Sequence, residues 1–125
     1  MIIADSSIWI EALRAKNNYL DGLEELALEH NLLILEPLLA ELVQGAKSKA
    51  EIEDILCFWD ALPHINENHI WVEAGINSFN YKWKNKGVGI IDAFIITVAW
   101  KYNYKIWTLD KKLAEAAGRT YIFSS

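Results

Sequence analysis

The sequence predicts an α/β domain of three layers, in which a parallel sheet of about four to five strands is covered by helices on both faces. Short, continuously apolar segments alternate with longer segments that have helical spacing of apolar residues. Strands buried on both faces have this pattern, whereas strands of a half-exposed sheet alternate apolar and polar residues. The 125 residues are 53% hydrophobic with only two prolines and six glycines, so residues 1–125 are expected to form a single domain.

The first half of the chain is expected to hold two strands and four helices. Pro37 suits the first turn of a helix that ends near Gly45, and Ser48 with Glu51 forms a capping box at the start of the next. The expected elements are a strand at residues 2–4, a helix to about residue 14, a helix over 20–30, a strand at 32–35, a helix over 37–45 and a helix from 48 to before 63.

The second half is expected to contain three helices and two strands. Val72, Ile76, Phe79 and Trp83 would share one face of a long helix, which predicts that this face is buried. The segment 93–96 is apolar all round and therefore belongs to a central helix. The expected elements are a helix from about 68 into a break at 86–89, a helix from 92 to about 102, a strand at 105–108, a helix from 110 to about 117 and a strand at 121–123.

Charge is divided unequally along the chain. The formal net charge is −5, which argues against a protein that holds nucleic acid by bulk positive charge. Residues 1–73 carry 14 acidic and 4 basic side chains, whereas residues 74–125 carry 3 acidic and 8 basic side chains. This asymmetry indicates either a dipolar surface with one face that attracts a polyanion or an acidic partner, or ordinary solvated helix faces.

The single cysteine and the lack of long apolar segments indicate the cellular compartment in which the protein is expected. Cys57 allows no internal disulfide and is expected to lie in the core, which favours a reducing environment. Asp5 interrupts the first apolar run, so a signal peptide is not expected, and 93–100 is too short to span a bilayer. The sequence therefore predicts a soluble, cytoplasmic protein with no membrane partner.

Four carboxylates occupy positions that need an explanation. Asp5 follows one predicted strand, Asp110 lies two residues after Thr108 at the end of another, Asp92 begins a helix after a glycine-flanked loop, and Glu41 lies in an otherwise apolar helix. Helix capping would explain each aspartate alone, and a solvent-facing position would explain Glu41. Ligands of parallel sheets bind at the carboxyl ends of the strands, so the four could also converge at one edge.

A convergent cluster of carboxylates would need cations. Two carboxylates ~4 Å apart repel by about 4 kcal/mol at an effective dielectric constant of 20. Oxygen ligands select hard ions such as Mg²⁺ or Mn²⁺, and the three histidines have no zinc-like spacing. Such an ion completes its shell with substrate phosphate oxygens and activates water, which indicates phosphodiester hydrolysis.

The segments that carry these acids resemble the motifs of PIN-domain ribonucleases, and specifically of the small VapC-type toxins of toxin–antitoxin pairs. The matching segments, in order along the chain, are Ile3-Ala4-Asp5-Ser6-Ser7, Glu41-Leu42-Val43-Gln44-Gly45, Ile91-Asp92-Ala93-Phe94-Ile95 and Thr108-Leu109-Asp110-Lys111-Lys112. Leu113 departs from the family pattern, which more often has an aromatic residue there.

The resemblance implies a PIN-like sandwich and a metal-dependent endoribonuclease. Asp5, Glu41, Asp92 and Asp110 would be the catalytic residues and would bind one or two Mg²⁺ or Mn²⁺ ions, with Ser7 and Thr108 supporting the site. The substrate would be structured RNA, often a transfer RNA or a ribosomal loop, cut to leave a 5′-phosphate and a 3′-hydroxyl. The resemblance also implies a homodimer and a cognate antitoxin protein whose tail enters the active-site groove.

A basic and aromatic segment before Asp92 offers a candidate RNA contact. Residues 81–86 interleave aromatic and cationic side chains, and Lys84 and Lys86 could neutralise RNA phosphates. The alternative is that Trp83 belongs to the core and that the lysines form its solvated flank.

Two other function classes are compatible with this architecture. A binding module could keep the fold, contact RNA or a protein and lack hydrolysis, although the four filled acidic positions favour the enzyme. A phosphoacceptor signalling domain would be expected to carry two acidic residues at the end of the first strand, where this chain has Asp5-Ser6.

Overall fold

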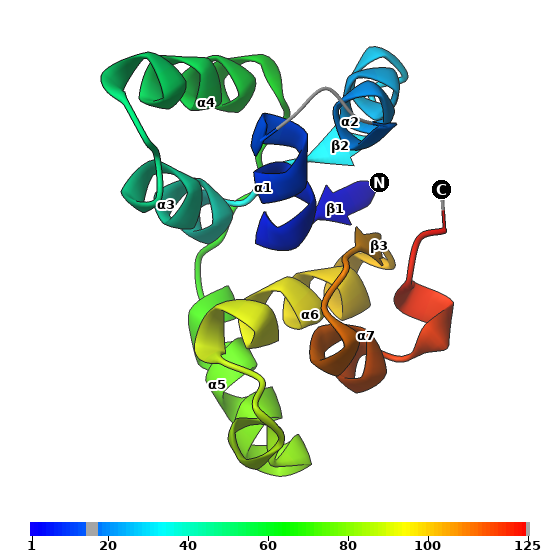
Figure 1. Ribbon diagram of the computed structural model, residues 1–125. Helices are drawn as coiled ribbons and strands as arrows, with labels where there is room; N and C mark the ends of the chain where they lie inside the picture. The colour runs from blue at the N-terminus through cyan, green and yellow to red at the C-terminus, as the bar shows by residue number, and fades with distance from the viewer. Residues whose placement is uncertain (15–17, 125) are drawn as a thin grey trace.

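A three-stranded parallel sheet organises the fold in the computed structural model, which describes residues 1–14 and 18–124 (Figure 1). The strands β1 (Ile2–Ala4), β2 (Leu32–Leu33) and β3 (Lys105–Trp107) lie in the order β2-β1-β3. Ile3 is paired with Leu33 on one side and with Ile106 on the other. β1 lies between the other two strands, so the chain runs from β1 to β2 on one side and later crosses to β3 on the other side. Such a change of side opens a crevice at the carboxyl ends of the strands.

Helices cover both faces of the sheet. Ile2 and Ala4 point into a core shared with the helices of the first half, whereas Ile3 points into a core shared with those of the second half. The helices are α1 (Ser6–Arg14), α2 (Asn18–Leu28), α3 (Glu36–Gln44) and α4 (Lys49–Ala61) in the first half, and α5 (Ile70–Tyr81), α6 (Ile90–Tyr102) and α7 (Lys111–Ala117) in the second. In Figure 1, α2 and α4 lie toward the top of the view, α5, α6 and α7 lie toward the bottom, and the strands lie between them.

The predicted α/β class and parallel sheet are confirmed, but the predicted strand count is wrong. The described residues form three strands rather than four to five. A short 3₁₀ helix (Arg119–Tyr121) occupies the start of the expected fourth strand, so only Ile122 pairs with β3, in an isolated bridge to Ile106. The chain after Gly118 therefore turns before it can extend along β3.

The prediction that the apolar face of α5 is buried is also wrong. Val72, Ile76 and Phe79 are 64%, 55% and 83% exposed, and α5 instead packs on α6 through Ile70 and Ala74. Ala74 is small enough to let the two helices approach closely. On the same side of α5, Asn77 donates a hydrogen bond to Thr97 of α6 (3.1 Å).

Trp83 is buried, although it does not belong to α5. Lys82 adopts a left-handed conformation with φ of 56° and ends the helix, and Trp83 begins a 3₁₀ helix (Trp83–Lys86). This change of direction brings the Trp83 ring to 5.5 Å from the Trp100 ring of α6. Cys57, which was expected in the core, is exposed on α4. Among the described helices, none is long and apolar enough to cross a bilayer.

The burial of Trp83 and the exposure of Phe79 predict that truncating these two aromatic side chains has unequal effects on stability. Trp83→Ala removes a side chain that is 2% exposed and should lower the free energy of unfolding by about 3–5 kcal/mol. Phe79→Ala should change it by less than about 0.5 kcal/mol, because this ring makes few buried contacts. Urea unfolding of the monomeric form at low protein concentration measures both values, and a similar loss in the two variants would contradict the observed packing of α5.

Candidate active site

Asp5 lies at the carboxyl end of the central strand and is buried, with only 4% of its surface exposed. Its backbone N–H donates to the carbonyl of Trp107 (3.0 Å), which extends the pairing of β1 with β3 by one residue. Its Oδ1 accepts hydrogen bonds from the backbone N–H groups of Ser7 (3.0 Å) and Ile8 (3.4 Å) in the first turn of α1. Asp5 therefore caps α1, which agrees with the helix-capping role considered for this residue from the sequence.

Two hydroxyl groups also donate to Asp5. Ser7 Oγ donates to Asp5 Oδ1, and Thr108 Oγ1 donates to Asp5 Oδ2 from the connection between β3 and α7. The same hydroxyl oxygens accept backbone N–H groups, that of Leu109 for Ser7 (2.9 Å) and that of Asp110 for Thr108 (2.9 Å). Each hydroxyl has one proton, and both protons are directed at Asp5, so this side chain acts as an ionised acceptor.

The environment of Asp5 acts on its pKa in two opposite directions. Burial raises the pKa above its usual value, whereas the hydrogen bonds from Ser7, Thr108 and Ile8 lower it and partly offset the burial. Oδ1 takes three of the four hydrogen bonds and Oδ2 takes one. A carboxylate oxygen has about two lone-pair positions, so Oδ2 retains one for a further ligand.

The other three acids come from three further segments. Asp110 is the N-cap of α7 and accepts from the backbone N–H groups of Lys112 (2.9 Å) and Leu113 (3.3 Å). Asp92 lies in the first turn of α6, a helix whose next seven residues are all buried. Glu41 is partly buried on α3.

Electrostatic interactions connect all four acids. Burial, followed by the negative charges of Asp110, Asp5 and Glu41, raises the pKa of Asp92 to about 6. Burial and the charge of Asp5 likewise raise the pKa of Glu41. None of the four forms an ion pair with a cation of the described residues. The structure thus brings the four predicted acids into one negative region at the carboxyl edge of the sheet.

The four carboxylates do not form a closed metal cage. Within residues 1–14 and 18–124, no group of three or more His, Cys, Asp or Glu side chains is arranged to hold a metal ion. Mg²⁺ usually keeps several waters and binds through one or two carboxylates together with substrate phosphates. The set of donors fits an open site of this kind, in which Asp5, Glu41, Asp92 and Asp110 would hold the ion directly or through water.

The predicted RNA-binding lysines lie on the 3₁₀ helix after α5, and both are exposed. Lys84 lines a hollow beside the exposed Phe79 of α5. Lys86 lines a different hollow together with Lys112 of α7, the helix that Asp110 caps. Lys86 therefore lies beside α7, whereas Lys84 lies beside α5.

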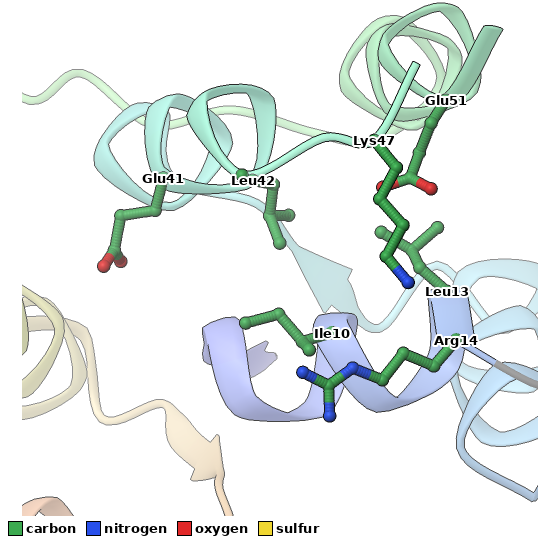
Figure 2. A pocket seen from close by; sticks show the side chains of 8 residues that line it. Ile10, Leu13, Arg14, Glu41, Leu42, Lys47 and Glu51 are labelled. Atoms are coloured by element: carbon green, nitrogen blue, oxygen red, sulfur yellow. The ribbon is translucent and has the colours of Figure 1, made fainter.

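Two basic residues near the acidic region were missed by the sequence analysis. Arg14 and Lys47 line a groove together with Glu41 (Figure 2). The signal that could have found them is compositional, since residues 1–73 contain only four basic side chains and these are two of them.

An α/β domain with acids gathered at the carboxyl edge of a parallel sheet has the architecture of a nuclease-like fold. The sequence model of the PIN domain matches residues 2–119, and the chain belongs to the PIN-domain family, whose members are generally metal-dependent nucleases. Among curated proteins, none matches the chain.

The raised pKa of Asp92 predicts that this acid destabilises the fold when it is charged. The pKa of this carboxyl group rises from an ordinary value of 3.8 to about 6 in the folded protein. The folded state then binds more protons between these values, so stability falls as the pH rises through this window. At pH 7.5 in EDTA, Asp92→Asn should therefore stabilise by on the order of 1 kcal/mol, because the side chain is only partly buried.

A thermal melt measures this effect as a rise in Tm of about 4 °C. The gain should disappear near pH 4, where the carboxyl group is protonated in both states. Glu53→Gln removes an exposed acid from α4 and serves as the matched control without a gain. An Asp92→Asn protein that melts below the parent at pH 7.5 would contradict the repulsion described above.

Proposed function

We propose that the protein is a metal-dependent endoribonuclease that hydrolyses RNA phosphodiester bonds and acts as the toxin of a VapBC-type toxin–antitoxin pair. The observation that carries the nuclease assignment is the mutual effect of four acids from separate segments, seen most clearly in the pKa of Asp92. Membership of the PIN-domain family supports the same activity.

In this proposal Asp5 is the fixed point of the site. Ser7 and Thr108 hold its carboxylate ionised and in one orientation, so its remaining lone pair is ready for a cation. Glu41, Asp92 and Asp110 complete the negative region from α3, α6 and the N-cap of α7. When bound, Mg²⁺ or Mn²⁺ would lower the pKa of a coordinated water and neutralise charge that develops on the phosphate.

The biological part of the proposal rests on the resemblance of the four motif segments to VapC-type toxins. The RNA would be a transfer RNA or a ribosomal RNA in the cytoplasm. The protein would act as a homodimer and be inhibited by a cognate antitoxin. The exposed apolar residues of α5 leave a surface on which a protein partner could bury Val72, Ile76 and Phe79.

A PIN-fold module that binds RNA or a protein without cleavage is the second candidate. The observation that favours it is the absence, among the described residues, of three or more ligands already arranged around one metal position. The two candidates differ in one measurable property, because only the enzyme requires the acids and a divalent cation for product formation.

The nuclease proposal predicts cation-dependent cleavage. The purified protein should cut transfer or ribosomal RNA in Mg²⁺ or Mn²⁺ and lose this activity in EDTA. Asp92→Asn should lower the cleavage rate at least about 100-fold without unfolding the protein, since it removes one charge that holds the cation. Gel electrophoresis of end-labelled RNA measures the products, and Asp54→Asn on the exposed side of α4 is the control.

Cleavage that is unaffected by EDTA would rule out the metal-dependent mechanism. RNA binding without any product, in wild type and Asp92→Asn alike, would instead identify the non-catalytic module.

The toxin proposal predicts a growth phenotype that depends on the same acid. Induced expression of the wild-type chain in a bacterial host should arrest growth, and expression of Asp92→Asn should not. Co-expression of the protein encoded by the neighbouring short reading frame should restore growth. Equal growth of the two cultures, at matched protein levels, would argue against the toxin role and leave the nuclease proposal to the cleavage assay.

A further inference from the structure

A groove runs from the acidic region between α1 and α3 to the start of α4. Its volume is about 390 Å³. Ile10 and Leu13 of α1 and Leu42 of α3 form its apolar part, and Glu41, Arg14 and Lys47 contribute charged side chains. Figure 2 shows Glu41 at one end of this space, while Lys47 extends toward α1 and Arg14 lies at the other end.

Glu41 places one end of the groove at the candidate active site. Its carboxylate interacts electrostatically with Asp5 and Asp92. Leu42, the next residue of α3, faces the groove itself. A linear polymer bound along this groove, with one part at the acidic region, would therefore contact Leu42 and Ile10 and then reach the two basic side chains.

Both basic side chains are available to an anion. Lys47 is exposed and forms no ion pair with any described residue. Arg14 contacts Glu11 at 3.5 Å, but both side chains are largely solvated, and such a pair contributes little to stability. A guanidinium group can bind phosphate through two parallel hydrogen bonds, and an ammonium group binds it as a point charge.

The location of these two cations is unusual for this chain. Residues 1–73 contain 14 acidic and only 4 basic side chains, yet two of the four basic ones line the groove that contains Glu41. If these basic side chains were ordinary solvated residues, there would be no reason for two of the four to line this one groove. The remaining charge is that of Glu51 at the start of α4, and Figure 2 shows Lys47 extending past Glu51 toward α1.

We propose, on the basis of the nuclease function above, that this groove binds the RNA strand adjacent to the phosphate that is cleaved, with Arg14 and Lys47 binding backbone phosphates. The aliphatic side chains of Ile10 and Leu42 contact the ribose and base between them. Arg14 and Lys47 are thus substrate-binding residues, and they set the path of the strand away from the acidic region.

The test uses three substitutions of matched size in the full-length protein. Arg14→Gln and Lys47→Gln each remove a positive charge from the groove, and Glu51→Gln removes a negative one. Lys105→Gln is the control, because Lys105 is an exposed residue at the amino end of β3, at the opposite edge of the sheet from Asp5. Thermal melts verify that all four variants fold.

Binding is measured in an Asp92→Asn background, so that RNA is not consumed, with a fluorescent single-stranded RNA of mixed sequence. Arg14→Gln and Lys47→Gln should each weaken binding about 5- to 10-fold near 0.1 M salt, and Glu51→Gln should strengthen it. Each lost contact should reduce the salt-dependence slope by about 0.7. In the active background, the same two variants should raise KM and leave kcat within about twofold.

The outcomes separate this inference from the proposed function. If the wild-type protein cleaves RNA and the groove variants bind and cleave like Lys105→Gln, the groove assignment is overturned and the nuclease stands. If the wild-type protein never cleaves RNA, the nuclease proposal fails, whereas the binding measurements still decide whether RNA occupies the groove. RNA affinity that is unaffected by all three groove substitutions would overturn the inference.

Discussion

The hydrogen-bonded carboxylate of Asp5 is the interaction on which the rest of the site depends. A carboxylate that is 4% exposed is stable in the fold only if its oxygens have donors. These donors come from the first turn of α1 and from Thr108, which is 103 residues away in the chain. Thr108 in turn accepts the backbone N–H of Asp110, so one network fixes two of the four acids and joins β1 to the connection between β3 and α7.

The mutual repulsion of the four acids acts against the stability that this network provides. Asp92 gains a favourable interaction with the amino end of α6, but burial and three neighbouring negative charges outweigh this gain and raise its pKa to about 6. The surrounding fold compensates for this destabilisation through α6, whose residues from Ala93 to Ala99 are all buried. A site whose charges repel one another and which is supported by a well-packed helix is the usual balance between stability and function.

The sequence predicts those parts of the molecule that depend on local signals. The strand at residues 2–4, the Ser48 cap that accepts from Glu51 N–H, and the cap of α7 by Asp110 are all present. The exposed face of α5 could not be predicted, because helical spacing of Val72, Ile76 and Phe79 does not reveal that the small Ala74 permits the closer approach to α6. The prediction of a fourth strand was wrong because it, too, depended on packing that the local sequence does not reveal. The turn after Gly118 competes with extension of the chain along β3. For the site, the three aspartates at element ends and Glu41 in an otherwise apolar helix were readable from the sequence. That Arg14 and Lys47 line the same groove as Glu41 depends on how α1, α3 and α4 pack.

The proposed action on RNA must be reconciled with a net charge of −5. Its overall field opposes the approach of RNA, so bulk attraction cannot supply the affinity. Binding must come from local contacts, and two such sources lie at opposite ends of one groove. At the Glu41 end, bound divalent cations would reverse the sign of the potential where the acids gather. At the other end, Arg14 and Lys47 supply positive charge that belongs to the chain itself. Because one source depends on cations and the other does not, the proposed RNA affinity and the proposed catalysis would respond to different residues of the same groove.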